Sequence, residues 1–109
     1  AMYGVPYARY HVHGIVEDQQ GTPIENAEVI IKEDNQRVLG DTLQTNESGT
    51  FDTTVSKFPV STLRIVVNDP SGVHASDSTQ VTISESGTNA NGFFRGDYNV
   101  EANIQLKKK

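Results

Sequence analysis

The sequence is 109 residues long, which is enough for one domain with a modest hydrophobic core. Fourteen acidic and nine basic side chains give a net charge of −5, which argues against nucleic-acid binding because such binding needs a basic surface. The chain has no cysteine, which excludes a disulfide framework and thiolate chemistry within it, and no apolar run approaches the roughly 18 residues of a transmembrane helix.

The first half of the chain alternates apolar and polar residues with the period of two that is typical of β-strands. Glycine and proline between the alternating runs, Gly21 and Pro23 among them, favour turns. On the first run Tyr10, Val12 and Val16 share the face that we expect to be buried. The pattern predicts strands at residues 10–17, 27–32, 37–45 and 51–55.

The second half continues this pattern, with strands predicted at residues 63–68, 79–83 and 98–106. Seven short alternating strands without a helical period indicate an all-β fold, a seven-stranded antiparallel β-sandwich. We expect residues 1–9 to form an N-terminal stalk and residues 10–107 to form a single domain. Lys107–Lys109 is expected to be a solvated tail.

Three segments carry a family resemblance. Gly14–Asp18 reads Gly-Ile-Val-Glu-Asp, Gly21–Val29 holds a Gly-Thr-Pro-Ile turn followed by Ala27 and Val29, and Thr45–Phe51 holds Thr45, Gly49 and Phe51. In this order they resemble the carboxypeptidase-regulatory-like (transthyretin-like) domains. The resemblance implies an immunoglobulin- or transthyretin-like Greek-key sandwich, and it carries fold rather than activity.

A second resemblance extends over most of the chain. Tyr3–Ala8, the loop at Gly21–Ile24, Ala75–Ser78 and Gly92–Gly96 together look like the radical-SAM-associated lipoproteins of Bacteroidetes-type bacteria. In that family a lipidated cysteine precedes the segment that Tyr3–Ala8 resembles. The resemblance implies a cell-envelope lipoprotein, facing the periplasm or the cell surface and held to the membrane by an N-terminal lipid whose cysteine this chain does not contain. It also implies a radical-SAM protein as a neighbour, although no residue identifies a modification site.

His11 and His13 are two residues apart on one predicted strand, a spacing that can direct two imidazoles at one metal ion. A zinc site needs three or four ligands, and His74 lies in a distant loop. We therefore expect two surface histidines and no metal.

A calcium site at one end of the sandwich is a further alternative, because carboxylate oxygens are the ligands that Ca²⁺ prefers. No calcium-binding loop motif is present, however, and turns favour aspartate for backbone hydrogen bonding. We expect solvated turn carboxylates and no cofactor. The carboxylates concerned are Asp41, Asp52, Asp69 and Asp77.

An enzyme alternative comes from the hydroxyisourate hydrolases, which use a transthyretin-like sandwich and which this chain loosely resembles at Arg95–Gly96 and at His11 or His13. Here Arg95–Gly96 precedes a strand instead of ending the chain, and further family residues have no counterpart. No Gly-x-Ser-x-Gly nucleophile motif occurs. We expect no catalytic residues.

An alternative hypothesis places a binding surface in the loops around residues 68–77 and 84–97. Exposed aromatics dominate binding hot spots, and Phe93 and Phe94 flank a glycine-containing loop. Arg95–Asp97 spells the tripeptide that integrins read on loops, although Asp97 is expected to open the last strand. The candidate surface consists of Phe93, Phe94, Arg95, Asp69 and His74.

The sequence thus predicts a non-enzymatic, exported module with a structural or binding role at the cell envelope. Its expected partners are the membrane, through the lipid anchor, and an unidentified protein or glycan, with no nucleic acid. The main alternative is a carbohydrate- or peptide-binding module that uses its end loops, and the second is the hydrolase.

Overall fold

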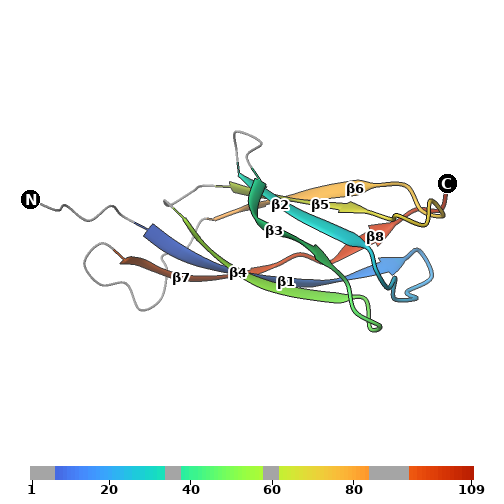
Figure 1. Cartoon of the computed structure of the whole chain (residues 1–109), viewed down its shortest axis with the longest axis horizontal. Helices are drawn as coiled ribbons and strands as arrows, with labels where there is room; N and C mark the ends of the chain where they lie inside the picture. The colour runs from blue at the N-terminus through green and yellow to red at the C-terminus, as the bar shows by residue number, and fades with distance from the viewer. Residues whose placement is uncertain (1–6, 34–37, 58–61, 84–93) are drawn as a thin grey trace, which may run out of the picture.

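The computed structural model describes residues 7–33, 38–57, 62–83 and 94–109. Two β-sheets face one another across a hydrophobic core, so the predicted all-β sandwich is confirmed (Figure 1). The chain crosses between the sheets after β1, β3, β4 and β6. The strands are β1 (Tyr7–Asp18), β2 (Glu28–Glu33), β3 (Val38–Gln44), β4 (Thr50–Lys57), β5 (Thr62–Asn68), β6 (Asp77–Thr82), β7 (Phe94–Glu101) and β8 (Ile104–Leu106).

The first sheet is built around β1, whose 12 residues make it the longest strand that the structure describes. β4 pairs with β1 antiparallel on one side. On the other side β7 and then β8 pair with β1 in parallel, from Tyr7 opposite Phe94 to Asp18 opposite Leu106. The antiparallel prediction therefore holds for β1 with β4 and for the second sheet, whereas β1 also has parallel neighbours.

The second sheet has the order β3-β2-β5-β6, and all of its pairs are antiparallel. Its inner face is set by the predicted alternation, because Leu63, Ile65 and Val67 on β5 are completely buried. Burial of an aliphatic side chain of this size contributes about 1.5 to 3 kcal/mol. β5 is thus a main contributor to the core from this sheet.

The first sheet supplies the facing half of the core. Tyr10, Val12 and Val16 are buried on β1, as their shared face predicts, and Phe51 on β4 packs among them. The rings of Tyr10 and Tyr98 stack with centroids 5.1 Å apart. In a chain without tryptophan, this pair supplies aromatic bulk.

Three predicted boundaries need correction. β1 already begins at Tyr7 and Ala8 is fully buried, so residues 7–9 belong to the sandwich and not to a stalk. The single strand predicted at residues 98–106 is interrupted between β7 and β8, which makes eight strands in the described part of the chain. The side chains of Lys107–Lys109 are exposed as expected, but their backbone is bonded to residues 73–75.

Gly14 explains the interruption. A Cβ atom at this position would lie 1.8 Å from the carbonyl oxygen of Ala102, so only glycine lets the segment between β7 and β8 pass over β1. There the Ala102 amide donates to the His13 carbonyl at 2.8 Å. The alternation of buried residues continues through this break, which is why the sequence pattern reads as one strand.

The described part of the chain contains no helix with the length and apolar character needed to span a bilayer.

Candidate functional site

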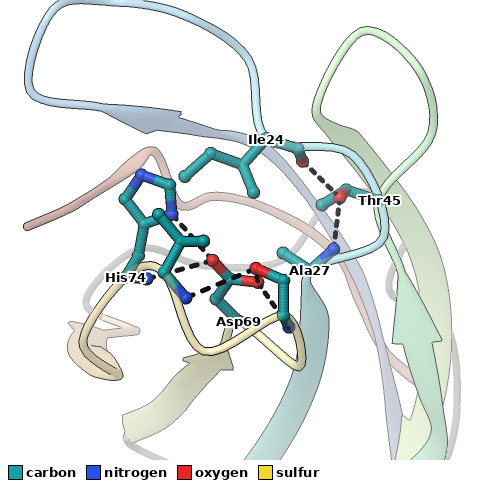
Figure 2. Close-up of polar contacts among 7 residues, drawn as sticks. Ile24, Ala27, Thr45, Asp69 and His74 are labelled. Carbon is teal, nitrogen blue, oxygen red and sulfur yellow. Dashed lines mark hydrogen bonds and ion pairs between the residues drawn. The ribbon is translucent and has the colours of Figure 1, made fainter. Parts of the chain in front are cut away.

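The loop between β5 and β6 folds around one carboxylate. Oδ1 of Asp69 accepts hydrogen bonds from the Ser71 amide at 2.9 Å and the Ser71 hydroxyl at 2.6 Å. Oδ2 accepts from the His74 amide at 3.1 Å and lies 2.7 Å from His74 Nδ1 (Figure 2). The Asp-Pro-Ser-Gly sequence favours this turn, because Pro70 fixes its own φ angle and Gly72 takes a φ of +80°.

This environment determines the pKa of Asp69. Only 5% of the Asp69 side chain is exposed, and this burial by itself would raise the pKa of Asp69. The hydrogen bonds from Ser71 and His74 outweigh it and lower the pKa to about 2. A carboxylate only accepts, so Nδ1 of His74 carries a proton, and Figure 2 shows the other ring nitrogen directed away from Asp69.

A second loop, between β1 and β2, stands opposite. The carboxylate of Asp18 accepts from the amides of Gln20 at 2.8 Å and Thr22 at 2.9 Å, which closes a tight turn at Gly21. The pKa of Asp18 is lowered, chiefly by the bond from Thr22 against a smaller opposing effect of burial, with the charge of His74 as a further contribution. The electrostatic influence of His74 reaches across from the facing loop.

Thr45 holds this second loop in place. Its hydroxyl is buried, donates to the Ile24 carbonyl at 2.6 Å and accepts from the Ala27 amide at 2.9 Å (Figure 2). The backbone of Thr45 adds bonds to Asn26 and Ala27. The cleft wall thus depends on a residue about 20 positions downstream of the loop that it supports.

The two loops border an open cleft of about 680 Å³. Both loops lie at the end of the sandwich where the C-terminus lies (Figure 1). The polar residues that line it include the acidic residues Asp18, Glu25 and Asp69 together with His74. Pro23, Pro70 and Val73 are apolar and exposed on its rim. No phenylalanine, tyrosine or tryptophan is among the described residues that line it.

A second polar cluster lies on the outer face of the first sheet. Arg9 Nε is 2.8 Å from Asp97 Oδ1, and Nε2 of His11 is 3.2 Å from the same oxygen. Nδ1 of His11 is 3.0 Å from the Thr54 hydroxyl. A smaller hollow of about 370 Å³ lies on the same sheet. It is lined in part by His13, which pairs with Asp52 of β4 on one side and with Glu101 of β7 on the other. Across the described ranges, no group of three histidines or carboxylates is placed to hold a metal ion.

The predicted binding surface does not form one patch. Asp69 and His74 lie in the cleft, whereas Phe94 and Arg95 open β7 at the opposite end of the sandwich, beside Tyr7 (Figure 1). Phe93 lies outside the described residues. Asp97 lies within β7 and is bonded to Arg9, so the Arg95–Asp97 tripeptide is not displayed on a loop.

The other sequence candidates fall in separate places. His11 and His13 share the outer face of β1, whereas His74 lies in the β5–β6 loop. The carboxylates of the calcium alternative are divided among β3, β4, the β5–β6 loop and the start of β6, and no metal-holding group of three is found among the described residues. Sequence reasoning named Asp69 and His74 but missed their contact. The sequence signal for this contact is the turn-forming Asp-Pro-Ser-Gly segment that starts at Asp69. Such a turn reverses the chain and brings His74, five residues further on, back to the aspartate.

Comparison with known proteins gives the fold. No protein-family model matches the chain, and no curated protein matches it. Catechol 1,2-dioxygenase of Acinetobacter radioresistens has a similar structure over 93% of this chain, with a TM-score of 0.65 and 14% identity. The Bacillus anthracis TIE protein (TM-score 0.64, 12% identity, 93% of this chain) and a streptococcal ancillary pilin (0.60, 16%, 92%) are also similar.

This chain spans 52% of the dioxygenase, 18% of the TIE protein and 32% of the pilin, so it corresponds to one part of each. At these identities the likeness shows a shared β-sandwich fold. Proteins with unlike roles carry this fold, so the fold by itself does not determine the function.

Proposed function

We propose that this chain is a non-enzymatic binding module whose cleft, between the β1–β2 and β5–β6 loops, takes a basic segment of a partner protein. The observation that carries the proposal is the cleft itself: about 680 Å³, lined by the acidic residues Asp18 and Glu25 from one loop and by the Asp69–His74 pair from the other. Clefts with a few convergent polar groups are the default binding sites of small domains.

The lining favours a lysine- or arginine-bearing peptide. Pro23, Pro70 and Val73 offer an apolar rim for the aliphatic stem of such a side chain, and the carboxylates offer a place for its charged end. A sugar-binding role has less support. No phenylalanine, tyrosine or tryptophan is among the described lining residues. Tyr98, a candidate platform for a sugar ring, is stacked on Tyr10 and packs against the core.

A non-catalytic role is supported by the hydrogen bonding of the pair. A hydrolytic triad needs a nucleophile bonded to the histidine nitrogen that faces away from the aspartate. Here the Ser71 hydroxyl donates to the Asp69 carboxylate itself at 2.6 Å, which ties it to the loop. Asp69 and His74 then serve to shape the cleft wall.

The test is an NMR titration of the isotope-labelled chain with blocked hexapeptides that carry either lysine and arginine or glutamate, and with neutral oligosaccharides. Basic peptides should shift the amides of residues 18–26 and 69–74, and added salt should weaken the effect. Asp18→Asn/Glu25→Gln keeps an acceptor at each position, so it should weaken binding with the fold intact. The matched control, Asp52→Asn/Glu101→Gln, removes two carboxylates from the outer face of the first sheet.

Shifts with the oligosaccharides instead would replace the proposal with a glycan-binding module. An absence of shifts with every probe, or an equal effect of the two double variants, would overturn it.

We further propose that the module works at the cell envelope, held by an N-terminal lipid. The support is the sequence resemblance to the lipoprotein family, together with the position of the cleft at the end of the sandwich away from the start of β1 (Figure 1). Reading the native gene upstream of Met2 and labelling lipids in the native cell tests this. A labelled cysteine supports the anchor, and an unlabelled protein removes it.

A further inference from the structure

The two ends of the described chain belong to strands that lie side by side and run in the same direction. β1 starts at Tyr7, next to Phe94 of β7, and ends at Asp18, next to Leu106 of β8. In Figure 1, β1 begins at the N-terminal end of the sandwich, and β8 leads to the C-terminus at the other end. β1 alone spans roughly 40 Å at about 3.3 Å per residue.

This arrangement has a mechanical consequence. If Tyr7 and Lys107 are pulled apart, β1 is drawn one way and β7–β8 the other way along their common direction. The bonds between parallel strands lie across that direction and are evenly spaced, so they are loaded together and none breaks far ahead of the next. We propose that the sandwich is a load-bearing module that resists tension between its two ends through shear of β1 against β7 and β8.

The break between β7 and β8 would be the weak point of this contact, and two further bonds close it. The Ala102 amide donates to the His13 carbonyl at 2.8 Å. The side-chain oxygen of Asn103 accepts from the Ile15 amide at 3.2 Å. Gly14, between them, allows the close approach. The contact of β1 with the C-terminal segment is thereby nearly continuous from Tyr7 to Asp18.

The C-terminal end is also held to the other sheet. The Ala75 amide donates to the Lys107 carbonyl at 2.7 Å, and the Lys109 amide donates to the Val73 carbonyl at 3.0 Å. Tension at this end therefore reaches both sheets. Residues 73–75 belong to the β5–β6 loop that forms one wall of the cleft, so a partner bound there would pull on the same structure.

An antiparallel pair at the sheet edge provides the contrasting geometry. Thr62 and Thr82 face one another at the end of the β5–β6 pair. Pulling these two residues apart opens that pair from its end, so its bonds are loaded one after another. The same molecule thus offers a shear direction and a peeling direction.

The experiment is single-molecule force spectroscopy with handles attached through introduced cysteines. Since the chain has no cysteine of its own, each pair of substitutions defines one pulling direction. Tyr7→Cys/Lys107→Cys loads the shear contact, and Thr62→Cys/Thr82→Cys peels β6 from β5. The proposal expects a higher unfolding force in the first geometry than in the second at the same loading rate.

Asn103→Ala sharpens the test because it removes a bond across the break. It should lower the unfolding force in the shear geometry and leave the peeling force unchanged, since forced unfolding is governed by the unfolding rate along the loaded direction. Asn99→Ala is the matched control, an exposed asparagine on β7. A shear force equal to or below the peeling force would overturn the proposal, and so would an equal effect of the two asparagine variants. Neither result bears on the peptide titration, so the two proposals fail separately.

Discussion

Asp69 and His74 are five residues apart in one loop, whereas Asp97 and His11 are 86 residues apart and meet because β7 pairs with β1. The loop pair is 2.7 Å apart, with side chains 5% and 17% exposed. The pair on the sheet is 3.2 Å apart, 16% and 37% exposed, and shares its carboxylate with Arg9. The same two residue types thus form a buried structural centre in one place and a solvated surface cluster in the other.

The difference follows from how each carboxylate is satisfied. Asp69 itself is buried and accepts backbone and side-chain bonds from its own loop, so removal of its charge weakens several bonds at a site that water reaches poorly. Asp97 bonds to side chains on a sheet face that water reaches, where solvent can replace a lost partner. The first pair should therefore matter to stability and to the cleft, and the second should matter little.

The largest effect is expected at Gly14, where β1 contacts residues 102–103, the segment between β7 and β8. Gly14→Ala places a methyl group against the Ala102 carbonyl and should cost about 3 kcal/mol of unfolding free energy. It should also disturb the His11 ring resonances while those of His74 stay in place. Urea unfolding and NMR measure the two effects. Gly21→Ala is the control, because it makes the same substitution at a φ of +86° with open space around the added methyl group, and it should cost only about 1 kcal/mol. Equal costs of the two substitutions would contradict the role of Gly14 in the close contact with Ala102.

The loop pair predicts a pH dependence. The pKa of Asp69 falls from 3.8 in the unfolded chain to about 2 in the folded chain, so its contribution is complete above pH 3.8 and disappears as the pH drops through 2. This difference corresponds to about 2 kcal/mol. In Asp69→Asn that part of the slope between pH 4 and 2 should vanish, as measured by urea unfolding at several pH values. Asp52→Asn, exposed on β4, should keep the slope, and a wild-type slope in Asp69→Asn would refute the assignment.

Thr45→Val should cost about 1.5 kcal/mol, because it leaves the buried Ala27 amide and Ile24 carbonyl without their side-chain partner. Amide exchange at residues 24–27 should accelerate, since this wall of the cleft loses its support. Thr45→Ser keeps the hydroxyl and serves as the control. If serine and valine destabilise equally, the hydrogen bonds are not what holds the loop.

The smallest effect is expected at the sheet pair. Asp97→Asn should lower stability by less than about 1 kcal/mol, and the difference should shrink in high salt. A double-mutant cycle with Arg9→Gln measures the coupling directly. A coupling as large as the cost of Asp69→Asn would erase the distinction between the two pairs.

Local pattern accounts for much of what the sequence predicts correctly. The alternation on β1, β2 and β5 identifies their inner faces, since side chains of a strand point alternately to its two sides. Turn chemistry identifies the loop at Asp69, because aspartate, proline and glycine each favour it for a local reason. The acidic charge and the absence of cysteine follow from composition alone.

Long-range pairing decides the rest. The parallel contact of β1 with β7 and β8, the meeting of His11 with Asp97, and the bond of Thr45 to Ile24 all join residues that the sequence separates. The same holds for the cleft, whose walls come from loops of different strand pairs, and for the separation of Phe94 from Asp69. Periodicity reports which side of a strand is buried. Which strand becomes its neighbour depends on the packing of two sheets against each other, and that is a property of the folded chain.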